Sequence, residues 1–206
     1  MTPEHKESYK CLTIKRLLTM SVGDMPFRPD GQPSYLDYSL NIDIAEPSKI
    51  VFRYNNLCPY LVGVALTSVV GDLGEFIVDN ILNPLGITSY EYQRCPDGYF
   101  YSASKMKLTV HDMSKIALLM AQGGVYNGQR IVSEEYVKEA TSVQNPNKEG
   151  GYGYYFWKYR DGFCISGKWE QKCYVVPSKN MLITYLADIR DGSQDLRLSM
   201  ERNFLD

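Results

Sequence analysis

The sequence predicts a single α+β domain over residues 1–206, and three observations lead to that class. The chain has 206 residues, 44% of them hydrophobic, which is enough to build a packed core. Residues 1–150 show mainly helical periodicity with capping signals. Residues 151–206 hold aromatic and β-branched runs followed by one helical segment. Helices first and strands last predict a small antiparallel sheet rather than alternating βαβ units.

The first helices are predicted from capping and stop signals. Thr13 is placed to cap a short helix through Met20 that ends near Gly23. Residues 24–50 hold four prolines and little periodicity, so we expect an irregular surface segment there. Pro59 suits the first turn of a helix that stops at Gly71.

Three more helices are expected to begin at capping residues. Asp72 with Glu75 and Thr109 with Asp112 are spaced as capping boxes. The first of these helices is closed by Pro84 and Gly86, and the second by Gly123-Gly124. Ser133 is expected to cap a helix near residues 134–141.

The last third of the chain is predicted to be mostly strands. The turn residues 177–180 join the last two strands into an antiparallel hairpin. Leu196, Met200 and Phe204 recur at four-residue spacing, which predicts a helix that covers one face of the sheet. The expected strands are Tyr152–Trp157, Gly162–Ser166, Lys172–Val176 and Met181–Leu186.

Composition argues against several classes of function. The net charge of -2 does not fit a general nucleic-acid or anionic-membrane binder. No apolar run reaches the length of a membrane span, and the first residues hold no apolar signal core. Five cysteines without a Cys-x-x-Cys pair and two histidines predict neither a metal site nor a cofactor. These features favour a cytoplasmic location for the chain as it stands.

Common catalytic motifs are not evident in this composition. His111, the base that a Ser/His/Asp triad would need, falls in a predicted first helical turn with no nucleophile elbow nearby. Gly151-Tyr152-Gly153 is not followed by a helix start, so it is not a phosphate loop. The carboxylates are scattered, and no glycosidase pair stands out.

Seven segments of the chain stand in an informative order: Leu12–Ser21, Phe52–Asn56 with Tyr60–Gly63, Asn83–Ile87, Leu108–Met113, Gly123–Gly128, Gly151–Trp157 and Tyr174–Pro177. In this order they resemble the serine β-lactamase-like hydrolases, which include class C β-lactamases, D-alanyl-D-alanine carboxypeptidases and related esterases. The resemblance covers roughly residues 11–190 and implies the β-lactamase/transpeptidase-like fold.

The resemblance also implies a reaction and its site residues. In the family a serine in Ser-x-x-Lys forms an acyl-enzyme that water cleaves. The family's Tyr-x-Asn motif is similar to Tyr54-Asn55-Asn56, which implies Tyr54 as proton shuttle and Asn56 as substrate holder. A tyrosine acts as a base only where cations favour its phenolate, because its free pKa is about 10.

A third family motif, Lys-Thr-Gly or a variant ending in Gly-Gly, lies on a sheet strand and is similar to Ser166–Gln171, which implies a strand there. The resemblance implies Lys168 as the cation and the backbone N–H of Gln171 as an oxyanion donor. Trp169 and Glu170 stand where the family prefers small residues. Trp169 would therefore contact and obstruct substrate, and Glu170 would repel an anionic one.

The family's Ser-x-x-Lys helix would precede the first matched segment, so the chain resembles a family member truncated or degenerate at its N-terminus. Ser102 and Ser104 precede lysines at that spacing, but in a stretch unlike the family's nucleophile. Without the family's early strands, Met181–Leu186 would be an apolar sheet edge, which predicts a homo-oligomer or strand exchange.

Three functional hypotheses follow. The first is a relative of the hydrolases of β-lactams, D-alanyl peptides or small esters that is inactive alone. The second is a non-catalytic module that binds a ligand or peptidoglycan in an aromatic cleft, which would be lined by Tyr152, Tyr154, Tyr155, Trp157 and Trp169. The third is an enzyme that uses Ser102 or Ser104.

Overall fold

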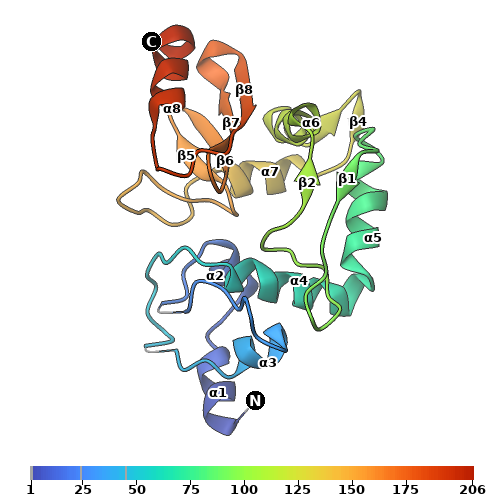
Figure 1. The fold of residues 1–206 in the computed structure, drawn as a ribbon, viewed down its shortest axis with the longest axis vertical. Coiled ribbons are helices and arrows are strands. Elements are labelled where there is room, and N and C mark those ends of the chain that lie inside the picture. Colours follow the sequence, from blue (N-terminus) through green and yellow to red (C-terminus); the bar gives the residue numbers. More distant parts are fainter. Residues whose placement is uncertain (1, 24, 45) are drawn as a thin grey trace.

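The chain folds into two lobes, as Figure 1 shows, and the helix α4 (Leu57–Val70) lies where they meet. The computed structural model describes residues 2–23, 25–44 and 46–206. The N-terminal segments and α4 form one lobe, and a four-stranded sheet with α6, α7 and α8 forms the other. This is the expected α+β architecture, with most helices before the main sheet.

Most of the predicted helices are present, with side-chain caps where the sequence places them. The side chains of Thr13, Asp72, Thr109 and Ser133 each accept a hydrogen bond from a backbone N–H three residues later. The helices are α1 (Pro3–Tyr9), α2 (Ile14–Leu18), α3 (Tyr35–Leu40), α4 (Leu57–Val70), α5 (Leu73–Ile77), η1 (Val78–Leu82), α6 (Val110–Ala121), α7 (Glu134–Thr141), η2 (Pro177–Lys179), α8 (Asp195–Met200) and η3 (Glu201–Leu205).

Helix α3 corrects the expectation that residues 24–50 are irregular throughout. Its N-cap, Ser34, donates a hydrogen bond of 2.5 Å to Asp97. The same carboxylate accepts the backbone N–H groups of Tyr35 and Leu36. A residue more than sixty positions away therefore satisfies the free end of this helix, and local sequence gives no sign of it.

The main sheet is antiparallel, with strand order β5-β6-β7-β8. The hairpin between β7 and β8 confirms the predicted turn, and Asn180 takes the left-handed conformation there. Residues 152–156 were expected to be strand, but they form a tight turn, because the N–H of Gly153 bonds the carbonyl of Phe156. The strands are β5 (Trp157–Tyr159), β6 (Gly162–Gly167), β7 (Gln171–Val176) and β8 (Met181–Leu186).

Two further two-stranded sheets were not predicted, because each of their strands has only two residues. The first joins β1 (Tyr90–Glu91) to β2 (Lys107–Leu108), and the second joins β3 (Val125–Tyr126) to β4 (Gln129–Arg130). Strands this short carry no period-2 pattern that a sequence could reveal.

Helices cover both faces of the main sheet. Helix α6 packs on one face through residues such as Ala117 and Met120. On the other face, Met200 and Leu205 are buried against Tyr174. The predicted C-terminal helix is confirmed, but its inward residues are Met200 and Leu205, whereas Leu196 and Phe204 are exposed.

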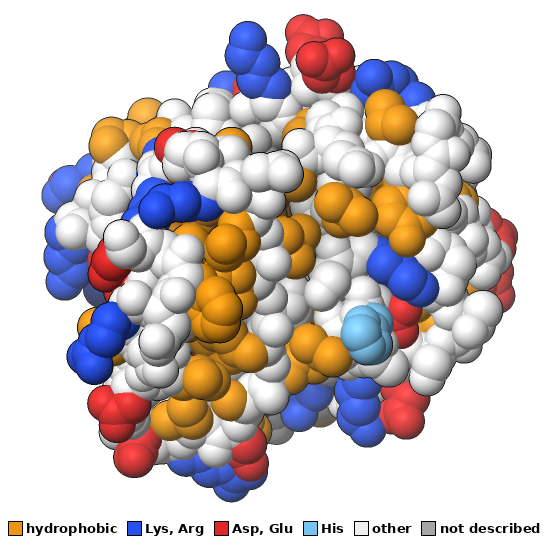
Figure 2. Space-filling model, turned by 90° about the horizontal axis from the view of Figure 1, so that it is seen from above, with side chains coloured by type: hydrophobic (Ala, Val, Ile, Leu, Met, Phe, Trp, Pro, Cys, Tyr) orange, Lys and Arg blue, Asp and Glu red, His pale blue; other side chains and the backbone are white. Residues whose placement is uncertain are grey.

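The end of the molecule that carries α8, β8 and α6 is rich in exposed apolar side chains. Figure 2 shows them gathered in a band on this end. Strand β8 lies at the edge of the sheet, paired with β7 alone. The exposed apolar residues of this end are Val110, Leu118, Leu186, Leu196, Leu198 and Phe204.

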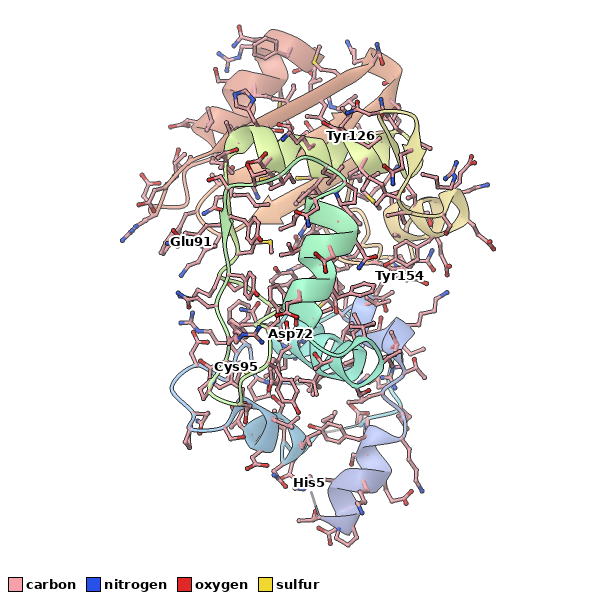
Figure 3. All side chains as sticks on the ribbon, turned by 90° about the vertical axis from the view of Figure 1, so that its right-hand side faces the viewer. His5, Asp72, Glu91, Cys95, Tyr126 and Tyr154 are labelled. Atoms are coloured by element: carbon pink, nitrogen blue, oxygen red, sulfur yellow. The ribbon has the colours of Figure 1, made fainter. Side chains whose placement is uncertain are left out.

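Polar contacts hold the two lobes together. Tyr154 lies between α7 and the N-terminal lobe (Figure 3), and its hydroxyl donates to Glu139 at 2.5 Å. Lys15 on α2 donates to the same carboxylate at 3.0 Å. Asn145 donates a buried hydrogen bond of 2.6 Å to Ser21. These bonds fix the N-terminal lobe against the residues that lead into the sheet.

In the described residues no single helix has the length and apolar character of a membrane span. Helix α4 followed by α5 and η1 meets both requirements only as a pair, and the pair is bent by 88°.

Candidate active site

The ring of Tyr54 lies in a cluster of aromatic side chains in front of α4. It stacks on Trp157 with ring centroids 5.7 Å apart and meets the edge of Tyr152 at 6.3 Å. On another side lies Phe27, also at 6.3 Å. Tyr54 remains 42% exposed, so the ring forms part of the surface while its neighbour Tyr152 is buried.

The electrostatic surroundings of Tyr54 favour the neutral phenol. Burial raises its pKa above the ordinary value of 10.0. Its contacts are with the aromatic rings of Phe27, Tyr152 and Trp157, which supply no positive charge. A phenol in this setting cannot take a proton from a nucleophile near neutral pH, because the phenolate is the rarer form.

The two asparagines after Tyr54 have different environments. Asn55 is buried; it accepts the backbone N–H of Cys58 at 2.9 Å and donates to the carbonyl of Arg53 at 2.8 Å. Asn55 therefore caps the first turn of α4. Asn56 is half-buried and makes no capping bond, although it stands at the N-cap position. Its side chain lies in hydrogen-bond contact with the hydroxyl of Tyr101.

The Lys-Thr-Gly-like segment forms a turn and not a strand interior. Gly167 pairs with Gln171, so Lys168, Trp169 and Glu170 make the connection between β6 and β7. Trp169 and Glu170 have φ of 61° and 65°, a region that favours glycine. The backbone at these two positions is therefore left-handed, although the side chains are large.

The side chains of this turn fold back onto the protein. The amine of Lys168 lies 4.2 Å from the ring centre of Trp169, and the guanidinium of Arg190 lies 4.3 Å from it. Glu170 forms an ion pair with Lys172 at 3.3 Å and accepts the hydroxyl of Tyr185 at 3.0 Å. The carboxylate is thus neutralised within the chain, so the expected repulsion of anionic substrates is weakened.

The candidate residues form two groups. In the described part of the chain, no hydrogen bond, ion pair or ring contact joins Tyr54 or Asn56 to Lys168, Trp169 or Gln171. Gln171 is exposed at the start of β7, where its backbone is part of the hairpin.

The two serines of the third hypothesis, Ser102 and Ser104, lie in a segment whose hydrogen bonds are made within the fold. Ser102 donates to the carbonyl of Pro59 at 2.7 Å and lies close to the backbone of Gly63 in α4. Ser104 is exposed, with its backbone N–H bonded to the carbonyl of Tyr101.

Sequence reasoning missed one serine that lies against a lysine. Ser166 on β6 accepts a hydrogen bond of 2.6 Å from Lys172 on β7. The two residues are six positions apart and meet through the register of the hairpin, so no Ser-x-x-Lys pattern marks them.

Two of the tyrosines expected to line an aromatic cleft are instead core residues. Tyr152 is 2% exposed and Tyr154 is 7% exposed. Tyr155 is half-buried, and its hydroxyl is buried without a hydrogen-bond partner in the described structure. Of the expected cleft residues Trp169 is exposed, and Tyr54 and Phe27, which were not expected in the cleft, are exposed as well.

Two cavities of the described structure are lined by residues other than these candidates. A cavity of about 370 Å³ is lined by residues that include Asp72 and Arg94, and another of about 420 Å³ by residues that include Glu91 and Lys107. Figure 3 labels Asp72 and Glu91 on the side of the molecule that carries these cavities. Among the described residues, no three His, Cys, Asp or Glu side chains are grouped as metal ligands.

The main sheet lies between two helical layers, and the lobe beside it carries a Tyr-x-Asn segment just before α4. Together these features define a β-lactamase/transpeptidase-like fold. A family model described as Beta-lactamase matches residues 2–202. The chain therefore belongs to the beta-lactamase family. A comparison with curated proteins found no match.

Solved structures support the fold. A Bacillus anthracis protein assigned as a 6-aminohexanoate-dimer hydrolase superposes with a TM-score of 0.76 at 19% identity, over 93% of this chain and 59% of that one. A β-lactamase assigned in Bacteroides dorei DSM 17855 gives 0.71 at 15% identity, over 94% and 69%. The octameric penicillin-binding protein homologue from Pyrococcus abyssi gives 0.55 at 18% identity, over 79% and 45%. The chain thus spans 59% of the length of the Bacillus anthracis protein.

Proposed function

We propose that this chain carries the substrate-holding part of a β-lactamase-like serine hydrolase and is inactive by itself. Its substrates would be β-lactams, D-alanyl peptides or small esters, with Tyr54 as proton shuttle and Asn56 as substrate holder. The side of the substrate site opposite Tyr54 and Asn56 would be lined by Lys168, Trp169 and the backbone of Gln171. The observation that carries the proposal is the environment of Tyr54, which is exposed and next to Asn56 but surrounded by rings.

The chemistry explains why the chain would be inactive alone. Acyl transfer needs an activated hydroxyl and a group that accepts its proton. Burial and aromatic neighbours keep Tyr54 protonated, and its contacts provide no lysine to reverse that preference. A second polypeptide segment that brought a serine and a lysine beside Tyr54 would supply both missing groups.

Complementation tests this proposal. Hydrolysis of nitrocefin and of a D-alanyl-D-alanine peptide is measured for the chain alone and with a separate polypeptide that carries a Ser-x-x-Lys helix. We expect no turnover by the chain alone and turnover in the mixture, which Tyr54→Phe lowers by 100-fold or more, about the range of a lost general base.

The control is Tyr126→Phe, because Tyr126 is a half-buried tyrosine on β3, which lies beside α6 (Figure 3). It should leave turnover in the mixture unchanged. Turnover of nitrocefin by the chain alone that depends on Tyr54 would contradict the proposal.

A second candidate function is a non-catalytic module that binds a ligand such as peptidoglycan. It is favoured by the exposed pair of Phe27 and Tyr54, which are 52% and 42% exposed with rings 6.3 Å apart. Calorimetry with peptidoglycan fragments should then show binding that Tyr54→Ala abolishes. Binding without turnover in the complementation mixture would favour this function over the first.

We also propose that the edge of β8 pairs with another chain, as a homo-oligomer or by strand exchange. The strand has no charged residue or proline, and α6 and α8 flank it with exposed apolar side chains. Light scattering should give a mass above 23.5 kDa, and Leu186→Lys should lower it. A compact monomer that binds no hydrophobic dye would count against this pairing.

A further inference from the structure

Four polar side chains meet beside the β6–β7 turn, on the sheet face that α8 covers. Ser166 lies opposite Lys172, and Lys172 lies opposite Tyr185, so their side chains share one face. Lys172 donates to Ser166 at 2.6 Å and pairs with Glu170 at 3.3 Å. Tyr185 donates to the other oxygen of Glu170 at 3.0 Å. These four residues form one continuous network, the Ser166–Lys172 cluster.

The arrangement in this cluster is that of a nucleophile, a proton acceptor and an orienting group. Each oxygen of Glu170 has its own partner, so the carboxylate is fixed and holds the amine of Lys172 toward Ser166. The side chains of Lys172 and Glu170 are 17% and 19% exposed, which leaves the cluster in reach of a small molecule. Burial raises the pKa of Tyr185 to about 12, so its hydroxyl keeps donating to Glu170.

We propose that Ser166 is an acylation site for small activated esters, with Lys172 as the proton acceptor. The oxygen of Ser166 attacks the ester carbonyl, and its proton passes to the amine form of Lys172. The Oγ–C bond forms, the ester C–O bond breaks, and the leaving alkoxide takes the proton from Lys172. The products are acyl-Ser166 and an alcohol, and no other reactant is needed. The proposal rests on this cluster and not on Tyr54 or Asn56.

Glu170 holds the side chain of Lys172 in place through the ion pair at 3.3 Å. Only the amine form of a lysine can accept a proton, and a free lysine is mostly ammonium at neutral pH because its pKa is about 10.4. The reaction should therefore be slow at neutral pH and should speed up as pH rises. The other titratable or charged groups around Lys172 are Cys164 on β6, Tyr174 on β7, Tyr185 on β8 and Arg197 on α8.

None of these four groups forms an ion pair with Lys172 in the described structure, whereas Glu170 does. Burial raises the pKa of Cys164 to about 12, and it also raises the pKa of Tyr174, so both stay neutral over the working range. The guanidinium of Arg197 is paired with Glu201 at 3.1 Å.

The first test uses the unsubstituted chain. A fluorophosphonate probe attaches to a serine oxygen with loss of fluoride, which mimics the acylation step. Intact mass should show one adduct per chain, and peptide mapping should place it on Ser166, with a rate that increases from pH 7 to pH 9. The absence of an adduct, or an adduct on another residue, would overturn the proposal. Nitrocefin turnover is not involved, so this result and the complementation result are independent.

Substitutions then test the roles. Ser166→Ala should remove the adduct. Lys172→Arg keeps the positive charge but not the proton acceptor, and it should lower the rate by about 100-fold or more.

Lys179→Arg is the matched control, because Lys179 lies on η2 outside the cluster, and it should leave the rate unchanged. Thermal unfolding of each variant confirms that it is folded. An unchanged rate in a folded Lys172→Arg variant would overturn the role of Lys172.

Discussion

Replacing Tyr155 by phenylalanine should stabilise the protein. Its ring packs against the core of the N-terminal lobe, but its hydroxyl is buried with no hydrogen-bond partner in the described structure. Burial raises the pKa of this hydroxyl, so ionisation does not relieve the missing bond. The substitution keeps the ring and removes only the unsatisfied oxygen.

The size of the effect follows from the cost of an unsatisfied polar group, about 1–3 kcal/mol. We expect Tyr155→Phe to raise the free energy of unfolding by about 1 kcal/mol, the lower end of that range, because only one group is relieved. The adjacent Tyr154 is the matched control, since its hydroxyl donates to Glu139 at 2.5 Å. Tyr154→Phe should lower the free energy of unfolding, because it removes this bond and gains nothing in return.

Urea and thermal unfolding followed by circular dichroism measure both changes. For a chain of this length, 1 kcal/mol shifts Tm by about 2–4 °C, so the two variants should move in opposite directions by measurable amounts. Equal slopes in urea would show that the unfolded states are comparable. A Tyr155→Phe variant less stable than the unsubstituted chain would refute the reasoning, because it would mean that the hydroxyl has a stabilising partner.

Three further predictions concern stability. Hydrogen bonds from the hydroxyl of Thr109 and, to a smaller extent, from Lys115 hold the pKa of Asp112 below 3.8. Because the folded-state pKa is lowered, Asp112→Asn should destabilise the protein above about pH 4. The difference in stability should vanish as pH falls through the folded-state pKa. Denaturation at pH 7 and pH 3 compares the two conditions. Asn55→Ala removes the cap of α4 and should cost about 1–2 kcal/mol, measured by urea unfolding. Gly124 has a φ of 87°, and an added Cβ would meet the carbonyl of Val132. Gly124→Ala should therefore lower the free energy of unfolding by more than about 1 kcal/mol, measured as a lower Tm.

Local signals explain which parts of the fold could be predicted. A cap such as Ser133 and a stop such as Gly71 act within one turn of the helix they limit, so the sequence beside them is sufficient. The same holds for the β7–β8 hairpin, where the turn residues fix φ in the connection itself. In each case the residue that determines the structure lies next to the structure it determines.

Long-range contacts explain what could not be predicted. Helix α3 depends on Asp97, which lies far along the chain. The expected strand over residues 152–156 is aromatic and fits the strand pattern, yet the left-handed backbone of Tyr155, with φ of 65°, turns the chain there. That conformation is maintained by packing of the Tyr155 ring on the N-terminal lobe, which outweighs local strand preference.

The candidate site shows the same division between local and distant determinants. Tyr54 and Asn56 could be named as candidates because a motif of three neighbouring residues carries them, whereas the strand expected at Trp169 and Glu170 is a turn. The hydrogen bond between Ser166 and Lys172 could not be identified in that way, because it depends on a three-residue turn that sets the register between β6 and β7. A turn longer by one residue would place the two side chains on opposite faces of the sheet. The large residues at left-handed positions in this turn therefore bear on chemistry as well as stability, since the turn that they form determines which lysine Ser166 meets.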